Sequence, residues 1–392
     1  MKNNKKNIVV IITIIILLLF CIIIIPEQYR KIRYVEFKTI GVLKYPRLSH
    51  KSLIIGDDIL TYQGDYENIL FNPTVIETYN IKTKESIEDK EISNILKLGA
   101  LDRLNSWKHY FIIQRIGINQ RFGIKNTIEY YNVKTKKFDR TIDINDNYPS
   151  NILILDNGDL FLYDSSNAIK YLFEKNHFTK SNCKINSKAS NLSTTAIPLK
   201  DNSILVISTE NAYIYKDNMC KPIESIHFKA NEFTNGFYDR IDAPFFMPFG
   251  DNHFAVFTFN PYKHLNKIVL YNVNNFRIET VQEFKTETIP YALNSGKIIK
   301  LDDNRIIIIG GTWRIFPPIF TLASNKIYLY DYKQNKLSQI TSLQYFPYIY
   351  SSTSDYSVVV TSEQQLYIIG NYNIYNNKDI KMLDLSERGE KW

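Results

Sequence analysis

The sequence contains few cysteines, glycines and prolines. Among its 392 residues there are 3 Cys, 14 Gly and 13 Pro. Cys21, Cys183 and Cys220 show no CxxC spacing, which excludes a disulfide-dense framework and a multi-thiolate zinc module. The low glycine and proline content excludes collagen-like and low-complexity chains, whereas 44% hydrophobic and 14% aromatic residues provide the apolar surface of a large core.

The body of the chain has no excess of one charge sign. The formal net charge is +8, but residues 1–35 hold six lysines and arginines against one carboxylate, and basic and acidic residues alternate after them. A basic face for nucleic acid is therefore not expected.

One long hydrophobic run stands near the start of the sequence. All but two of residues 8–25 are Ile, Leu, Val or Phe, and as a helix they span about 27 Å, enough to cross a bilayer. Because Pro26 and Glu27 follow with no small-residue cleavage site, we interpret the run as an uncleaved transmembrane signal anchor. A narrow bias in flanking lysines and arginines places residues 1–7 in the cytoplasm as a short basic tail and the body outside the cytoplasm.

Short apolar or alternating runs rich in Ile, Val, Tyr and Phe fill the chain from Arg47 onward, with no helical periodicity, which indicates strands. Asp and Asn recur between these runs, and both residue types tolerate the left-handed backbone of tight hairpins. The turns lie at Asp57-Asp58, Asp156-Asn157-Gly158, Asp201-Asn202, Asp251-Asn252 and Asp303-Asn304.

A second signal repeats seven times at intervals of about 50 residues. Each copy is an apolar strand that ends in an aromatic residue or Leu and then a polar residue. The copies are Ile76–Asn80, Ile128–Asn132, Ile169–Phe173, Ala212–Lys216, Ile268–Asn272, Ile327–Asp331 and Ile380–Asp384. A period of this size, made of four short strands, predicts units that stack on their neighbours, and closure into a ring removes the exposed end faces. The sequence therefore predicts an all-β, seven-bladed β-propeller.

The best-formed unit resembles a kelch repeat. It runs from Ile298 through Asp303-Asn304 to Gly310-Gly311 and continues in Tyr330-Asp331. Pro46–His50 is similar to the motif that opens many kelch units, and Gly389–Trp392 is similar to the approach to the fourth strand. The resemblance covers residues 46–392 in degenerate form, and it implies a kelch-like propeller.

The end of the chain predicts how the ring closes. If Trp392 opens the fourth strand of the last blade, no residue remains to complete it, so the strand-like segment Tyr34–Val42 is expected to supply that strand. The alternative makes this segment an unpaired stalk. With closure, residues 26–33 form a juxtamembrane linker and residues 34–392 form the propeller, which lies close to the bilayer.

The sequence lacks the common motifs of catalysis and cofactor binding. No two of its six histidines have a metal-ligand spacing, and no phosphate loop, nucleophile elbow or HExxH helix occurs. We therefore predict no metal, no cofactor and no catalytic residue. Copper-radical oxidases use a related propeller, but their Tyr, His and crosslinked Cys positions have no match in this sequence.

The connections between second and third strands differ in length. They are short turns at Ser165–Asn167 and Thr209–Asn211 in blades three and four, so these blades are expected to form a low side. Long connections at one position of each unit are expected on one face, and long loops in compact domains are usually functional. The five long ones are Asp65–Asn72, Gly117–Asn126, Asn260–Asn266, Thr312–Asn325 and Asn371–Lys378. Their aromatic and arginine content is typical of an interface. The candidate ligand or partner-binding residues are Tyr66, Arg121, Tyr262, His264, Trp313, Arg314, Tyr372 and Tyr375.

These observations favour a single-pass membrane protein whose extracytoplasmic propeller binds a protein partner or an envelope glycan without catalysis. In an oxidising compartment Cys183 and Cys220 either pair as a disulfide or remain separate thiols. The alternative is a sugar-processing enzyme of the kelch-like mutarotase or epimerase type, which requires a convergent arginine and a carboxylate or histidine at the loop face.

Overall fold

The computed structural model describes twenty-one stretches of the chain. They are residues 38–44, 50–62, 75–96, 103–115, 126–144, 151–164, 167–180, 183, 194–199, 201–207, 212–223, 245–249, 253–260, 265–285, 291–292, 297–310, 312–315, 320–323, 326–342, 356–370 and 379–385. No helix in these stretches is long and apolar enough to cross a membrane. The anchor predicted at residues 8–25 lies outside them.

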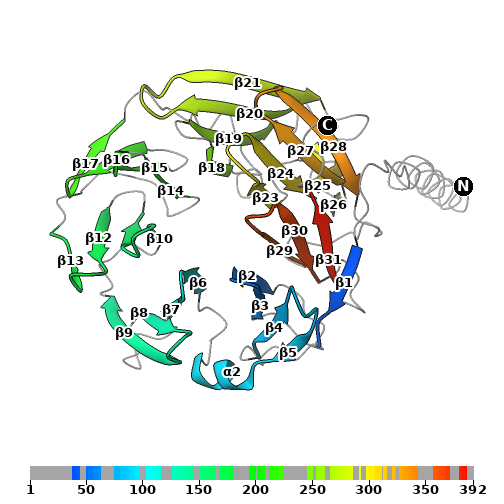
Figure 1. Cartoon of the computed structure of the whole chain (residues 1–392). Coiled ribbons are helices and arrows are strands. Elements are labelled where there is room, and N and C mark those ends of the chain that lie inside the picture. Colours follow the sequence, from blue (N-terminus) through cyan, green and yellow to red (C-terminus); the bar gives the residue numbers. More distant parts are fainter. Residues whose placement is uncertain are drawn as a thin grey trace, which may run out of the picture.

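Seven four-stranded antiparallel sheets lie around a common axis, which confirms the predicted all-β, seven-bladed propeller (Figure 1). Blade one consists of β2 (Lys51–Ile55), β3 (Asp58–Tyr62), β4 (Glu77–Asn80) and β5 (Ser86–Glu88). Blade two consists of β6 (Arg103–Trp107), β7 (Tyr110–Arg115), β8 (Asn126–Asn132) and β9 (Lys137–Ile144). Blade three consists of β10 (Asn151–Ile154), β11 (Leu160–Tyr163), β12 (Ala168–Leu172) and β13 (His177–Phe178).

The other four blades follow the same order. Blade four consists of β14 (Thr195–Pro198), β15 (Ile204–Ile207), β16 (Ala212–Lys216) and β17 (Met219–Pro222). Blade five consists of β18 (Phe245–Phe249), β19 (His253–Asn260), β20 (Leu265–Asn272) and β21 (Ile278–Lys285). Blade six consists of β23 (Lys297–Lys300), β24 (Arg305–Ile309), β27 (Lys326–Asp331) and β28 (Lys336–Ser342). Blade seven consists of β29 (Ser357–Val360), β30 (Gln365–Ile369), β31 (Asp379–Asp384) and β1 (Lys38–Val42).

The seven runs that repeat in the sequence are the third strands of the seven blades, as predicted. The first strand of each blade lies innermost in Figure 1. The second strands are the most deeply buried: every residue of β11 and β15 is buried, because these strands are covered on both sides by neighbouring blades.

The hydrophobic core consists of clusters between adjacent blades, and the ring is closed. One cluster joins blade one to blade seven: Ile59 and Tyr79 pack with Tyr367 and Ile380, and all four are at most 2% exposed. A linear stack would leave these two end faces in water. Contact between the first and last blades therefore establishes a ring, in which each blade buries both faces.

The segment before blade one closes the ring, as the chain end predicts. Strand β1 pairs antiparallel with β31, from Lys38 opposite Met382 to Val42 opposite Asp379. The hydroxyl of Tyr79 in blade one donates a 3.0 Å hydrogen bond to the carbonyl of Ile40. The clasp is therefore fixed both to blade seven and to blade one.

Tyrosine hydroxyls link neighbouring blades, which gives a physical reason for the 28 tyrosines in the sequence. Tyr62 in blade one donates to the Leu104 carbonyl in blade two at 2.9 Å, and Tyr130 in blade two donates to the Gly158 carbonyl in blade three at 3.1 Å. The rings fill the apolar space between sheets while the hydroxyls satisfy backbone carbonyls.

A short helix corrects the expectation that the body contains none. Helix α2 (Lys90–Leu96) follows β5. Asp89 caps its N-terminus, since the Asp89 carboxylate accepts a 2.8 Å hydrogen bond from the amide of Ile92. Leu96 is completely buried between blades one and two. Two helical turns are too few to produce a periodic pattern in the sequence, so the helix escaped detection.

Candidate functional site

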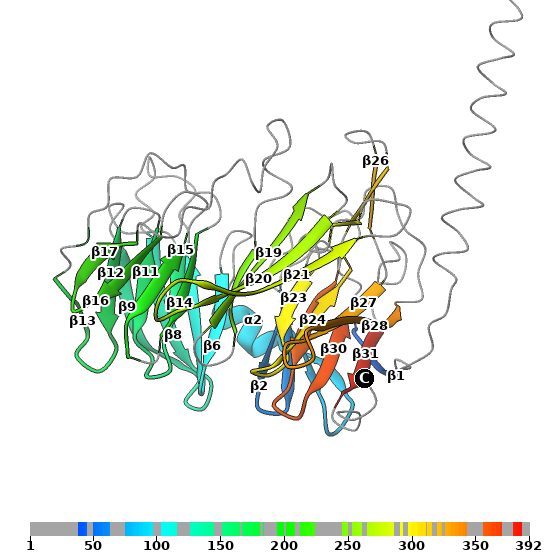
Figure 2. The same ribbon diagram turned by 90° about the horizontal axis from the view of Figure 1, so that it is seen from above.

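The two faces of the ring carry different connections. First and second strands are joined by tight turns on one side, which we call the turn face. The connections from second to third strands begin on the opposite side, which we call the loop face. The register shows this in blade one, where Lys51 lies opposite Tyr62, the last residue of β3. Figure 2 shows the ring from the side, with β26 at the loop face.

Two of the five long connections differ from the expectation. In blade five, Asn260 pairs with Leu265, so Asn260–Asn266 is a short hairpin closing two eight-residue strands, rather than a long loop. In blade six, Thr312–Asn325 contains β25 (Thr312–Ile315) and β26 (Phe320–Ala323). These form a three-stranded sheet with β22 (Tyr291–Ala292). In both segments, residues expected in a loop belong to paired strands instead.

The predicted binding residues fall into two groups. Trp313 and Arg314 lie on β25, where Trp313 pairs with Tyr291 and Arg314 with Thr321. The other six lie outside the described residues: Tyr66, Arg121, Tyr262, His264, Tyr372 and Tyr375. The connections from β13 to β14 and from β17 to β18 also begin at the loop face, and most of their residues lie outside the described stretches.

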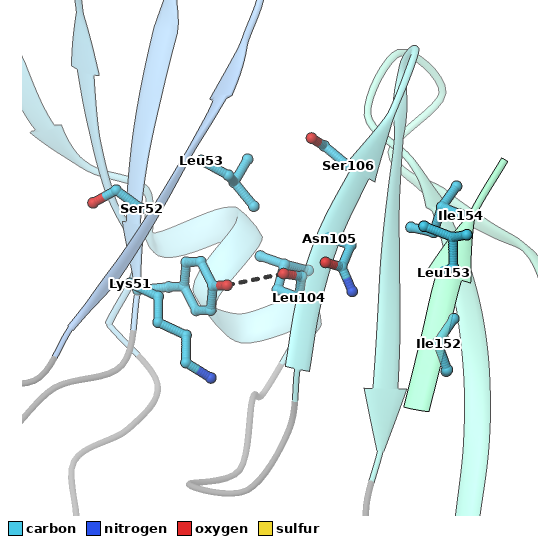
Figure 3. A pocket seen from close by; sticks show the side chains of 10 residues that line it. Lys51, Ser52, Leu53, Leu104, Asn105, Ser106, Ile152, Leu153 and Ile154 are labelled. Carbon is cyan, nitrogen blue, oxygen red and sulfur yellow. Dashed lines mark hydrogen bonds between the residues drawn. The ribbon is translucent and has the colours of Figure 1, made fainter. Parts of the chain in front are cut away.

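A cavity of about 520 Å³ lies along the innermost strands of blades one, two and three. We call it the inner-strand cavity. The residues that line it are Lys51, Ser52, Leu53, Tyr62, Leu104, Asn105, Ser106, Ile152, Leu153 and Ile154. Figure 3 shows these side chains on β2, β3, β6 and β10, with a hydrogen bond from the Tyr62 hydroxyl to the Leu104 carbonyl. Its size is in the range of pockets that hold small molecules.

The wall of the cavity combines apolar and polar groups. Leu53, Leu104 and the Ile152–Ile154 segment supply hydrocarbon. Asn105 and Ser106 are exposed and supply amide and hydroxyl groups that donate and accept hydrogen bonds. Burial raises the pKa of the Tyr62 phenol, so this group stays protonated at neutral pH.

The charges on the innermost strands are all positive. The seven strands β2, β6, β10, β14, β18, β23 and β29 contain Lys51, Arg103, Lys297 and Lys300 but no Asp or Glu. Two of the four cations have partners: Lys297 donates to the Tyr356 carbonyl, and Lys300 forms a 2.7 Å ion pair with Asp303.

Lys51 and Arg103 are the other two, and we call them the cation pair. Each is the first residue of its strand, at the loop-face end of β2 and β6, and each is exposed. Within the described stretches, neither forms an ion pair with a carboxylate. Desolvation, followed by repulsion from Arg103, lowers the pKa of Lys51. Two adjacent like charges without a counter-ion favour a bound anion.

Sequence reasoning missed the cation pair because it concentrated on the aromatic loops. A usable signal was present: both residues open the first strand of a blade, and no carboxylate occurs on any of the seven strands that line the axis.

Cys183 and Cys220 form a disulfide with their Cα atoms 4.7 Å apart. Cys183 follows blade three, and Cys220 lies on β17 of blade four. The disulfide therefore joins two blades at their outer side. It leaves neither cysteine as a thiol for another reaction.

No three His, Cys, Asp or Glu side chains in the described stretches come together as a metal site. His50 is 3% exposed, and its Nε2 lies 3.0 Å from the Ile369 carbonyl of blade seven. His50, which directly precedes β2, therefore links the first blade to the last.

Comparison with known proteins defines a fold class. The sequence matches no known family and no curated protein. Solved structures do match. A fungal alcohol oxidase of the AA5 family, solved in complex with copper, has 10% identity and a TM-score of 0.54, with coverage of 90% of this chain and 76% of the oxidase.

Two further structures match this chain. The oligogalacturonate lyase of Vibrio parahaemolyticus has 9% identity and a TM-score of 0.56, with coverage of 90% of this chain and 94% of the lyase. The WD40 propeller domain of Doa1 has 9% identity and a TM-score of 0.47, with coverage of 90% and 98%. At such low identity the likeness concerns the fold alone.

Proposed function

We propose that this chain is a membrane-anchored, non-catalytic binding module of the kelch type, which holds its ligand at the loop face and in the inner-strand cavity. The observation that carries the proposal is the cavity itself, whose wall brings polar groups and a lysine together on strands of three blades. Groups on rigid strands are pre-organised for a ligand, which reduces the entropy cost of binding.

Binding is the function that the cavity supports best. Opening and closing a sugar hemiacetal, as a mutarotase does, requires a carboxylate or imidazole facing the ligand. The described wall contains neither group, and its ionisable residues are Lys51 and Tyr62. No observation on the described residues favours the enzymatic alternative.

The kelch assignment is supported by two glycines. Gly310 and Gly370 each follow the second strand of their blade, with φ of 76° and 82°. The amide of Gly310 donates to the Lys326 carbonyl, and the amide of Gly370 donates to the Asp379 carbonyl, both at 2.9 Å. A left-handed glycine at this point corresponds to the position of the kelch double glycine, and the positive φ favours glycine there because it has no Cβ.

The disulfide supports an extracytoplasmic propeller, because disulfides persist in oxidising compartments. The test is labelling of intact cells with a membrane-impermeant maleimide. Cys183 and Cys220 should react only after reduction of their disulfide, and the reaction should need no lysis of the cells. Labelling without reductant, or only after lysis, would contradict the proposed topology.

The function is tested with full-length protein in detergent micelles. Wild type and the Trp313→Ala, Arg314→Ala variant are each incubated with fragments of the host's envelope glycan and with a library of envelope proteins. Bound ligand is then recovered and its mass is determined by mass spectrometry. We expect saturable capture of unaltered ligand. Release of a chemically changed product would show an enzyme, and no saturable capture of any ligand would refute the binding function.

A further inference from the structure

The charge of the inner strands is not explained by the stability of the ring. Some cations at strand ends have carboxylate neighbours, as Lys216 has Asp201 at 2.8 Å and Arg305 has Asp302 at 2.6 Å. Lys51 and Arg103, by contrast, begin the neighbouring strands β2 and β6 of adjacent blades, where Arg103 repels the charge of Lys51, and neither has a carboxylate partner in the described stretches. Two like charges side by side are unfavourable unless a ligand neutralises them.

We infer that the cation pair binds the carboxylate or phosphate group of a small hydroxylated ligand that occupies the inner-strand cavity. This inference rests on the proposed binding function and specifies the ligand class. The Arg103 guanidinium can donate two parallel hydrogen bonds to an oxyanion, and the Lys51 ammonium adds a charge-assisted bond. Lys51 lines the cavity, and Arg103 precedes the lining residue Leu104 as the first residue of β6, so both cations stand at the loop-face ends of strands that border the cavity.

The rest of the cavity defines the uncharged part of the ligand. Asn105 and Ser106 are exposed on β6 and offer hydrogen bonds suited to ligand hydroxyl groups. Ser52 is already engaged, since its hydroxyl lies 2.5 Å from that of Ser357 and 3.1 Å from that of Thr61. Ile152, Leu153 and Ile154 of β10 line the cavity and would contact the ligand's carbon skeleton. A volume of about 520 Å³ accommodates a ligand of one or two sugar rings in size.

The test is isothermal titration of the full chain with three probes that share one ring. D-Glucuronate carries a carboxylate, D-glucose 6-phosphate carries a phosphate, and D-glucose carries no charge. We expect at least one anionic probe to bind about tenfold or more tightly than glucose, because charge-assisted hydrogen bonds add to the same hydroxyl contacts. The preferred anion distinguishes a carboxylate ligand from a phosphate ligand.

Matched variants locate the effect. Lys51→Gln and Arg103→Gln should each weaken the preferred anion about tenfold and leave glucose unchanged. Lys137→Gln removes the same charge from an exposed position on the outermost strand of blade two and should have no effect. An unfolding midpoint temperature equal to that of wild type shows that each variant is folded.

The outcomes are distinct. Equal affinity for glucose and both anions, no saturable binding of either anion at millimolar concentration, or unchanged anion affinity in Lys51→Gln would each overturn the inference. The first outcome leaves the binding function intact, because the cavity would still hold a sugar. The proposed function fails only if envelope glycans and proteins also show no saturable capture.

Discussion

Charged residues are arranged differently on the turn face and at the loop-face end of the innermost strands. On the turn face, Lys82 pairs with Asp57 at 2.6 Å and Lys216 pairs with Asp201 at 2.8 Å, so turn residues of one blade neutralise each other. At the loop-face end, burial and then repulsion from Arg103 lower the pKa of Lys51. The comparison teaches that these turn-face cations are neutralised within the protein, whereas the described stretches offer the cation pair no counter-ion, which a ligand would supply.

The largest effect is expected on the turn face, where the fold depends on backbone geometry. Gly158 has φ of +87°, and an added Cβ would lie 2.4 Å from the Trp107 ring. This ring is held by a 2.8 Å hydrogen bond from its Nε1 to the Asp156 carbonyl. Gly158→Ala should therefore lower the free energy of unfolding by about 2–4 kcal/mol, as measured by chemical denaturation.

Gly56 provides the matched control for this prediction. Its φ is +59°, and an added Cβ would meet nothing within 4 Å. Gly56→Ala should cost only the left-handed backbone penalty, about 1 kcal/mol. Equal losses in the two variants would show that the contact with Trp107 is unimportant. Anion binding by the folded fraction should be unchanged in both.

Charge reversal in the cation pair should separate binding from stability. Lys51→Glu places a carboxylate beside Arg103, which replaces repulsion by attraction. The free energy of unfolding should stay the same or rise by up to about 1 kcal/mol, while glucuronate affinity should fall by more than about tenfold. Denaturation and calorimetry on the same sample measure both quantities. Retained affinity, or a large loss of stability, would contradict the assigned role.

The affinity for an anion should depend on alkaline pH. Desolvation, followed by Arg103, lowers the pKa of Lys51, and a bound anion would raise it again. Binding should be strongest below the lowered pKa of the free protein and weaken as pH rises through the pKa of the complex. On the described cavity wall Tyr62 is the other ionisable group, with a raised pKa. β29, which also packs on β2, carries no charged residue.

Titrations from pH 7 to pH 11 in wild type and Lys51→Gln measure this dependence. The variant should lose the alkaline decrease that Lys51 causes, because glutamine does not titrate. Identical pH profiles for the two proteins would show that Lys51 is not the titrating group.

The smallest effect is expected for an exposed ion pair of the turn face. Lys82 and Asp57 are 74% and 51% exposed, so solvent screens their attraction. Lys82→Gln should change the free energy of unfolding by less than about 0.5 kcal/mol and should leave anion affinity unchanged. A larger loss would mean that the turn face depends on its ion pairs more than exposed pairs usually allow.

The sequence was sufficient to predict the ring but not its local departures. The third strands were detectable because Ile, Tyr and a polar end recur at a regular interval, and the closing role of β1 followed from the missing fourth strand. Helix α2 is too short for a periodic signal, and the extended hairpin of β19 and β20 uses residues that are equally suited to a loop.

The candidate site was less predictable than the fold. The sequence pointed to aromatic loop residues such as Trp313, which the structure places on an additional strand. Lys51 and Arg103 lie 52 positions apart in sequence, and only the assembly of blades one and two brings their charges together. A lone lysine at the start of a strand is usually solvated. Lys51 became a candidate binding residue only once the structure placed Arg103 on the adjacent blade.

The most direct test of the account is a crystal structure of the full chain soaked with the preferred anionic probe. The account predicts electron density for its carboxylate or phosphate within hydrogen-bonding distance of both Lys51 Nζ and the Arg103 guanidinium, with the ring directed toward Asn105 and Ser106. Density for the probe at another site, together with a protein carboxylate bound to the two cations, would contradict it.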